Sequence, residues 1–154
     1  AKYRHELIGL NSRLDELQAA ILGRALLPRL AGWTARRRAI AERYRHELAQ
    51  PAVRPLPAPE GSESVWHLFP VRVLHGRREA LVAHLKREDI LTAVHYPIAI
   101  PDQPALAGLP FESVDELTRA RGLCQQELSL PIHPYLTDAH VTRVISAINA
   151  WPAA

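Results

Sequence analysis

The sequence predicts an α/β protein in which a long helical segment precedes a small layered domain. Apolar residues recur at helical spacing over residues 12–49, and strand-like and helix-like patterns alternate after residue 65. Between these parts, residues 50–61 hold four prolines and a glycine, a composition typical of a linker or an extended crossing. We therefore expect a helical segment over residues 1–50 and a small α/β domain over residues 51–154.

The helical segment has a recognisable start. Ser12 is a candidate hydroxyl cap, and Asp15 and Glu16 would lie in the first turn, where carboxylates face the positive end of the helix dipole. Pro28 then either kinks this helix or opens a second one. The apolar residues of the two parts are Leu14, Leu17 and Ile21 before Pro28, and Leu30, Trp33, Ile40, Tyr44 and Leu48 after it.

The small domain is predicted as alternating strands and helices. Thr137 is expected to cap the final helix, whose valines and isoleucines recur at i, i+3, i+4 and i+7. Pro70 indicates that its strand is an edge strand or carries a bulge. A two-layer build with the helices on one face of the sheet fits this order. The predicted elements are a strand over 65–73, a helix over 77–88, a strand over 90–96, a loop over 97–110, a helix over 115–127, a strand over 128–130 and a helix after 137.

Composition narrows the classes of site. The 154 residues contain one cysteine, Cys124, so no disulfide within the chain and no cysteine metal cage can form. The eight histidines are scattered without paired metal-ligand spacing, and we expect no metal site. No apolar run approaches the ~20 residues of a membrane span, and no signal-peptide layout is present, so we expect a cytoplasmic protein without membrane contact.

The charge is unevenly distributed along the chain. Residues 1–50 hold 10 Lys/Arg against 5 Asp/Glu, a net charge of +5, whereas the remainder holds 9 against 11, a net charge of −2. A basic first third is compatible with a phosphate-bearing ligand, with a nucleic-acid face or with the solvated side of an arginine-rich helix.

Two short stretches carry candidate site residues. Gly9, Asn11 and Arg13 stand just ahead of a helix start, where free backbone N–H groups and a guanidinium suit an anion; an ordinary cap with an exposed arginine is the alternative. His95 and Tyr96 end a predicted strand just before a loop, a position that often lines a site but is also compatible with simple packing.

Five blocks of this sequence resemble the DegT/StrS-type sugar aminotransferases, in the family's order and over nearly all 154 residues. They are GLNSRLDELQAAIL (9–22) with LPRLAGWTARRRAIAERY (27–44), VWHLFPVRV (65–73), VHYPI (94–98), QPA (103–105) and LSLPIHPYLT (128–137). The resemblance implies a fold-type-I enzyme dependent on pyridoxal 5′-phosphate (PLP), built as a homodimer with active sites at the subunit interface. Such enzymes move an amino group, usually from glutamate, onto a keto-sugar linked to a nucleoside diphosphate.

The resemblance also implies that part of the active site lies elsewhere. The lysine that holds the cofactor belongs upstream of the Gly9–Arg13 motif, and neither Lys2 nor Lys86 stands in its motif. The sequence also contains no methionine and opens on Ala1. We therefore expect the chain to be the C-terminal small domain and helical segment of a longer enzyme, with no catalytic residue of its own and no transaminase activity alone.

Four residues of this chain match functional positions of the family. Asn11 matches the asparagine that reaches across the dimer to the PLP phosphate, and Arg13 matches an arginine contributed in trans near the cofactor and substrate phosphates. His95 and Tyr96 match the block near the sugar. That block often reads HYPxPxHxQ, whereas this chain has Ala99 and Pro101 in place of the usual proline and histidine.

Two other functions remain open at this stage. A non-catalytic remnant of the family could serve as a dimerisation or interaction module. The arginine-rich helix could bind nucleic acid, but it lacks aromatic interleaving and the net charge is only +3, so we expect no nucleic-acid partner.

Overall fold

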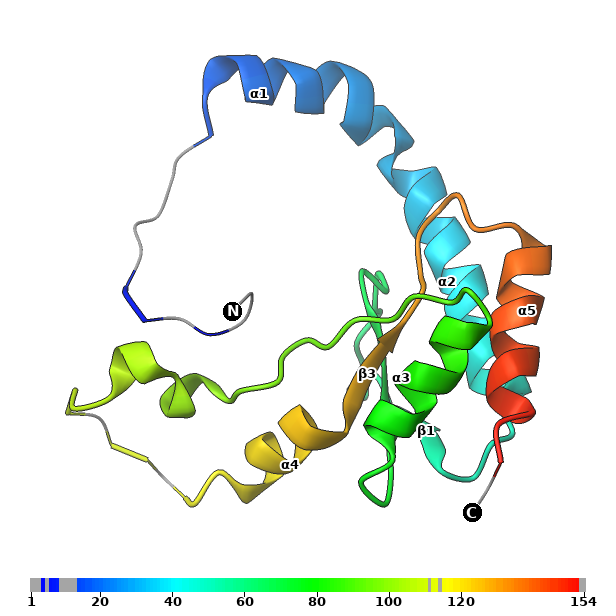
Figure 1. Ribbon diagram of the computed structural model, residues 1–154. Helices are drawn as coiled ribbons and strands as arrows, with labels where there is room; N and C mark the ends of the chain where they lie inside the picture. Colours follow the sequence, from blue (N-terminus) through cyan, green and yellow to red (C-terminus); the bar gives the residue numbers. More distant parts are fainter. Residues whose placement is uncertain (1–3, 5, 9–13, 111, 114, 153–154) are drawn as a thin grey trace.

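The computed structural model describes residues 4, 6–8, 14–110, 112–113 and 115–152 (Figure 1). The N-terminal helical part comprises α1 (Glu16–Ile21), a π-helical turn η1 (Leu22–Leu26), a 3-10 turn η2 (Leu27–Arg29) and α2 (Leu30–Glu47). The remainder comprises β1 (Val53–Pro55), β2 (Phe69–Val73), α3 (Arg78–Arg87), the 3-10 turns η3 (Ile100–Asp102) and η4 (Pro104–Leu106), α4 (Thr118–Gln126), β3 (Glu127–Leu130) and α5 (Asp138–Asn149).

The three strands form one antiparallel sheet in the order β1-β2-β3. Alternate residues of β2, Phe69, Val71 and Val73, point to one face and are fully buried. Apolar residues of α2, α3 and α5 complete a single core against this face, which confirms the predicted mixed fold of helices on a small sheet. All four residues of β3 are buried, so this strand is covered on both faces.

The second half of α2 belongs to this core. Ile40, Ala41 and Tyr44 are fully buried, and the Tyr44 hydroxyl donates a hydrogen bond of 2.8 Å to the carbonyl of Pro131, just after β3. At the end of α2, the side chain of Asn149 accepts a hydrogen bond of 2.8 Å from the Ala49 N–H. The helix is therefore tied both to the sheet and to α5. The domain boundary near residue 50 stays a prediction.

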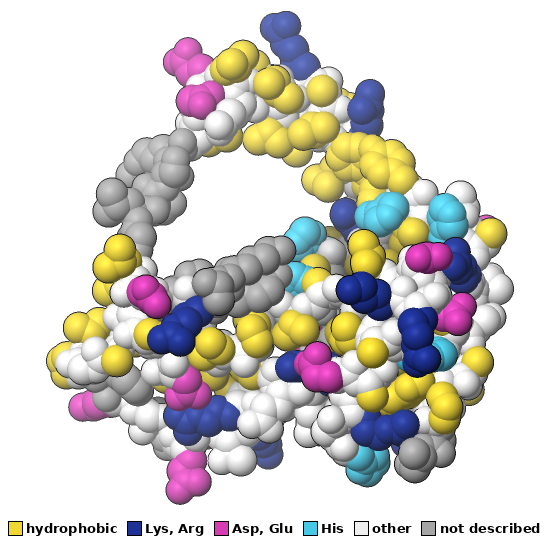
Figure 2. Space-filling model, in the orientation of Figure 1, with side chains coloured by type: hydrophobic (Ala, Val, Ile, Leu, Met, Phe, Trp, Pro, Cys, Tyr) yellow, Lys and Arg dark blue, Asp and Glu magenta, His cyan; other side chains and the backbone are white. Residues whose placement is uncertain are grey.

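Residues 16–29 form a helical arm that extends away from the sheet (Figure 1). None of its residues is buried in this chain. Hydrophobic side chains gather along it in Figure 2, and its large exposed members are Leu17, Ile21, Leu26 and Leu27. The predicted apolar stripe thus exists, but among its described members only Ile40 and Tyr44, in the second half of α2, are fully buried within this chain.

The arm begins later than the sequence predicts, whereas Pro28 opens the second helix, which is one of its two predicted roles. The cap of α1 is Asp15, whose carboxylate accepts a hydrogen bond of 2.8 Å from the Gln18 N–H; Ser12 lies outside the described residues. The change of helix type begins at Leu22, six residues before Pro28, and the 3-10 turn then carries that proline. Proline in the first turn needs no backbone donor, so it opens α2 without breaking it.

The strand predictions need three corrections. Residues 65–68 are not part of β2. Residues 90–96 form no strand but only a single bridge between Ala93 and Ser129. A strand that the sequence analysis missed, β1, lies within the proline-rich stretch 50–61. The helix predicted over 115–127 is shorter, and Glu127 belongs to β3.

The geometry of the sheet explains how prolines are tolerated in β1 and β2. The Leu56 N–H donates to the Pro70 carbonyl at 3.3 Å, so the backbone of Pro70 is opposite Leu56, which lies just past the end of β1. The N–H that Pro70 lacks is therefore not needed for pairing within β1. Because hydrogen-bonded and non-hydrogen-bonded pairs alternate, the neighbouring pair of Pro55 and Val71 requires no donor from the proline. Pro70 therefore lies in the central strand, without a bulge, and not in the predicted edge strand.

Several arginines of α2 are engaged in ion pairs within the fold. Arg36 contacts Asp138 at 2.8 Å, Arg38 contacts Glu63 at 3.0 Å, and Arg43 contacts Glu47 at 2.7 Å. The basic side of this helix is thus partly neutralised by neighbouring carboxylates, as expected of a solvated helix face.

Within the part of the chain that the structure describes, no helix has the length and apolar character to cross a membrane.

Candidate functional site

The candidate site lies where residues 92–96 run beside β3. The bridge between Ala93 and Ser129 is made by two backbone hydrogen bonds of 2.8 and 3.2 Å. This pairing adds residues 92–96 along the edge of β3 that does not pair with β2. It brings His95 next to Glu127 and Ser129, whose side chains lie on the face of β3 opposite the hydrophobic core.

A chain of hydrogen bonds links the three side chains. The Ser129 hydroxyl donates to one oxygen of Glu127 at 2.6 Å, and the His95 backbone N–H donates to the other oxygen at 2.6 Å. The Nδ1 atom of His95 lies 2.9 Å from the Ser129 hydroxyl oxygen. Glu127 and Ser129 are only 5% and 4% exposed, so both carboxylate oxygens are satisfied inside the protein.

An open cleft of about 280 Å³ borders this chain of hydrogen bonds. His95, Ser129 and Thr92 supply its polar side chains, and its wall is otherwise apolar. The apolar wall consists of Leu68, Leu91, Ala93, Leu130, Pro131 and Ile132. An apolar surface with a few fixed polar groups is the usual form of a small-molecule site.

Tyr96 lies beside this cleft and not in its wall. Its ring meets that of His95 edge-on, with 5.5 Å between the centroids, and the residue is 58% exposed. The His95–Tyr96 peptide bond is cis. The structure thus brings His95, but not Tyr96, into the cleft of this chain.

The loop after Tyr96 carries the two positions that depart from the family pattern. Ala99 is buried, and Pro101 is half-buried in η3. The loop is tied to α4 by Arg121, which binds both carboxylate oxygens of Asp102 at 2.9 and 2.7 Å. This fork lowers the pKa of the Asp102 carboxyl, because it stabilises the charged form.

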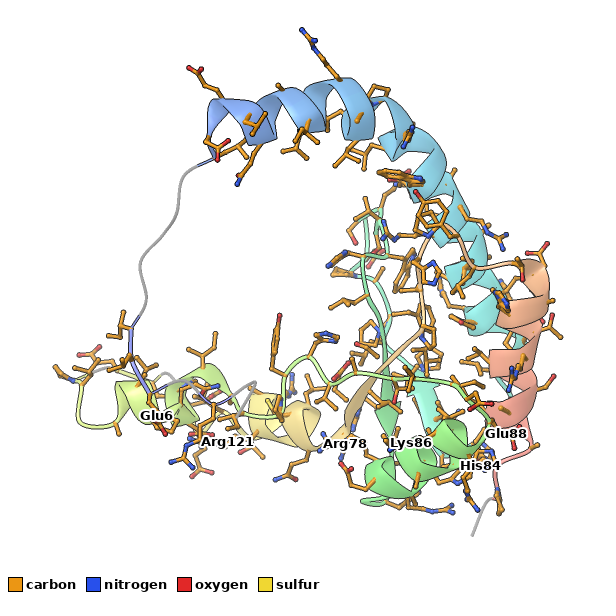
Figure 3. The ribbon with its side chains drawn as sticks, turned by 45° about the horizontal axis from the view of Figure 1, so that its top comes forward. Glu6, Arg78, His84, Lys86, Glu88 and Arg121 are labelled. Atoms are coloured by element: carbon orange, nitrogen blue, oxygen red, sulfur yellow. The ribbon has the colours of Figure 1, made fainter. Side chains whose placement is uncertain are left out.

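The remaining predicted site residues stand apart from this cleft. Asn11 and Arg13 lie outside the described residues, as does Lys2. Lys86 is exposed in the last turn of α3 and does not line the cleft (Figure 3). No group of three metal-ligating side chains occurs among the described residues.

Sequence reasoning missed Glu127 and Ser129 as parts of the site. The sequence places Glu127 at the end of a helix and Ser129 in a strand of purely structural role. The available signal was their spacing: two polar residues at positions i and i+2 of a short strand share one face. A polar pair on a buried face requires partners, and His95 supplies them.

Sequence and structure comparisons agree on the family to which this chain belongs. The profile of the DegT/DnrJ/EryC1/StrS aminotransferase family matches residues 1–149. The chain belongs to this family.

Individual relatives match almost the whole chain. A dTDP-3-amino-3,4,6-trideoxy-alpha-D-glucose transaminase from Streptomyces venezuelae is 45% identical over 153 residues, which are 97% of this chain and 39% of that protein. The crystal structure of Streptomyces venezuelae DesV in complex with a ketimine intermediate superposes with a TM-score of 0.80 at 43% identity, covering 98% of this chain and 40% of that one. A family aminotransferase from Brucella abortus gives a TM-score of 0.80 at 31% identity, covering 96% and 38%. The chain therefore spans about 40% of the length of these relatives.

Proposed function

We propose that this chain is the C-terminal part of a PLP-dependent aminotransferase that transfers an amino group, from glutamate, to a keto-sugar linked to a nucleoside diphosphate. The observation that carries the proposal is the match over residues 1–149 to the aminotransferase family, together with relatives named as nucleotide-sugar transaminases. The cleft beside β3 supports it, because a ring nitrogen, hydroxyls and an apolar wall suit the hydroxyl-bearing and apolar faces of a deoxysugar.

The candidate site residues of this chain are assigned either to the sugar or to the phosphates of PLP and the substrate. His95, in the cleft, is assigned to the sugar, with Tyr96 at its rim. Asn11 and Arg13 are assigned to the phosphates of PLP and substrate, reached from the partner subunit of a homodimer. A guanidinium suits that task because its fixed fork of donors matches two phosphate oxygens.

The described part of the site does not by itself fit PLP. The lining of the cleft contains neither an arginine nor a lysine that could bind the cofactor's phosphate. Lys86 lies outside the cleft, in the last turn of α3. The chemistry of the cofactor is electron withdrawal from the amino-bearing carbon. The lysine that holds PLP is proposed to lie on the large domain of the same enzyme, so we derive no step through the cofactor from this chain.

The test uses the complete reading frame that encodes this chain. The purified protein is mixed with PLP, and L-glutamate is added while the absorbance of the bound cofactor is recorded. Conversion to the pyridoxamine form, followed by its return on addition of a nucleotide-linked 3-keto sugar, is the expected result. Absence of both changes in a folded protein that binds PLP would overturn the proposal and favour the non-catalytic interaction module.

The 154-residue chain serves as the matched control. With Lys2 and Lys86 its only lysines, borohydride reduction in the presence of PLP should give no stoichiometric adduct at a single site on peptide mapping. A single adduct accompanied by turnover would contradict the assignment of the lysine to another part of the enzyme.

A further inference from the structure

The proposed function assigns no role to Glu127 or to the hydrogen bonds that join it to Ser129 and His95. We propose that these two residues are positioning residues that fix the tautomer of His95, with the proton on Nδ1, so that Nε2 is the accepting nitrogen of the neutral ring. The pair thereby makes His95 a hydrogen-bond acceptor for a hydroxyl group of the ligand. This last step rests on the proposed function, whereas the tautomer itself is a property of this chain alone.

The direction of the hydrogen bonds follows from counting protons. An ionised carboxylate only accepts, and both oxygens of Glu127 do so, one from Ser129 and one from the His95 backbone N–H. The Ser129 hydroxyl has one proton, which it donates to Glu127. Its oxygen therefore offers only lone pairs to Nδ1 of His95, 2.9 Å away, and Nδ1 must carry the proton.

Four other histidines have a ring nitrogen in a hydrogen bond among the described residues, and each of these rings, when neutral, requires the proton on Nε2. The Nε2 atom of His84 lies 2.9 Å from the Ala147 carbonyl, which can only accept, and Nε2 of His46 lies 2.6 Å from a carboxylate oxygen of Glu42. In His133 and His140 the Nδ1 atom accepts a backbone N–H. Among the histidines so described, His95 alone is held with the proton on Nδ1.

A fixed tautomer matters because a neutral imidazole donates from one nitrogen and accepts at the other. When the ring is neutral and its proton lies on Nδ1, Nε2 of His95 cannot donate to a carbonyl oxygen of the ligand. It can accept a hydrogen bond from a hydroxyl group of the ligand. A site that hydrogen-bonds a substrate hydroxyl discriminates against analogues that lack it. We assign this discrimination to His95 and its orientation to Glu127 and Ser129.

The tautomer is measured directly by a long-range ¹H–¹⁵N correlation spectrum of the 154-residue chain labelled in its histidines. The spectrum is recorded at about pH 8.5, some two units above the ordinary imidazole pKa, and its correlation pattern distinguishes the two neutral tautomers from a protonated ring. We expect the Nδ1–H pattern for His95 and the Nε2–H pattern for His84 in the same spectrum. An Nε2–H pattern for His95 in the unmodified chain would overturn the proposal, because it would mean that the hydrogen bonds run the other way.

Glu127→Gln gives the sharpest variant. The new amide keeps the shape of the carboxylate, accepts the His95 N–H with its oxygen and donates its NH₂ to Ser129. The Ser129 hydroxyl then turns its proton towards Nδ1, and the tautomer of His95 inverts to Nε2–H. Ser129→Ala removes the acceptor and should lower the Nδ1–H fraction. The control Gln126→Ala, which removes two hydrogen bonds from Arg72, should leave the His95 signals in place. Unchanged tautomers in both Glu127→Gln and Ser129→Ala would refute the role of the pair.

The functional step is tested separately in the complete enzyme. Ser129→Ala and Glu127→Gln should lower kcat/KM for the keto-sugar about tenfold, the usual weight of one directed hydrogen bond, and leave the glutamate half-reaction unchanged. Equal kcat/KM in variant and parent would overturn the link to the sugar. If the Nδ1–H tautomer is observed but the complete enzyme shows no transamination, the proposed function fails and the positioning pair stands.

Discussion

At the scale of single residues, Tyr44 connects α2 with β2 and with the residue that follows β3. It is fully buried, packs against Phe69 with 5.0 Å between the ring centroids, and donates its hydroxyl to Pro131. Burial raises the pKa of its phenol well above the ordinary value of 10.0, because the charged form would lose its hydration. Packing and the hydrogen bond thus depend on a phenol that stays protonated.

Tyr44→Phe is expected to lower the free energy of unfolding by about 1 kcal/mol at pH 8, because the ring still fills its site while the hydrogen bond to Pro131 is lost. The difference from the parent should shrink above pH 10. There the unfolded phenol ionises and the folded one does not, so the parent loses about 1.4 kcal/mol by pH 11 and the variant loses none of it. Urea unfolding at pH 8 and pH 11 measures both values; a gap that widens with pH would contradict the assignment.

The site was predictable from sequence only in part. His95 and Tyr96 stand out because they end an extended segment before a loop, and His95 does line the cleft. Glu127 and Ser129 do not stand out, because their partner comes from a pairing between segments that are distant in sequence. A polar residue acquires such a role from the backbone opposite it, which local periodicity does not specify.

At the scale of elements, α5 is the helix that the sequence predicts best. Its start is a reciprocal cap: the Thr137 hydroxyl accepts the His140 N–H at 3.2 Å, and the His140 ring accepts the Thr137 N–H at 3.4 Å. Cap and apolar spacing are both local in sequence, so both could be predicted. In contrast, β1 was missed because prolines are read as breakers, although an edge strand tolerates them where no donor is needed.

Thr137→Ala should cost about 1 kcal/mol of stability, because the His140 N–H loses its acceptor at the start of α5. Ser146→Ala, at an exposed position of the same helix, is the matched control and should change stability by less than about 0.5 kcal/mol. Thermal unfolding of the two variants side by side gives the comparison. Equal effects would mean that the cap contributes nothing measurable.

The two parts of the helical segment should respond differently to one substitution. Ile40 in α2 is 0% exposed and Ile21 in α1 is 52% exposed. Ile40→Ala should therefore cost roughly 2–5 kcal/mol, because it leaves a cavity in the core, whereas Ile21→Ala in the same chain should cost less than about 0.5 kcal/mol. The midpoints of urea unfolding report both, and a large loss for Ile21→Ala would show that the arm is packed in solution.

At the scale of the whole molecule, the arm extends away from the sheet in a chain that spans about 40% of the length of its relatives. Three leucines and one isoleucine are exposed on the arm, and monomers rarely expose contiguous apolar patches larger than roughly a few hundred Å². This is the expected state of a segment whose proposed partners are a large domain and a second subunit. The residues assigned to the phosphates directly precede this arm in sequence, which is how one subunit could deliver them to the site of the other.

The proposed contact of Arg13 with the phosphates in the site of the other subunit can be tested in the complete enzyme. Arg13→Ala should weaken binding of cofactor or substrate roughly ten- to a hundredfold without unfolding, since hydrogen bonds to charged groups contribute about 1.5–3 kcal/mol. Arg13→Lys should restore only part of this, because a point charge lacks the fork of the guanidinium.

The decisive form of the test mixes Arg13→Ala subunits with subunits that lack the upstream lysine. If Arg13 acts across the interface, each hybrid dimer contains one site with both lesions and one site with neither, so transaminase activity should reappear on mixing. If Arg13 acts within its own subunit, every site of the hybrid has one lesion and activity stays absent. Native mass spectrometry establishes that hybrids have formed and bind PLP, so an inactive mixture would show that the cross-subunit assignment of Arg13 is wrong.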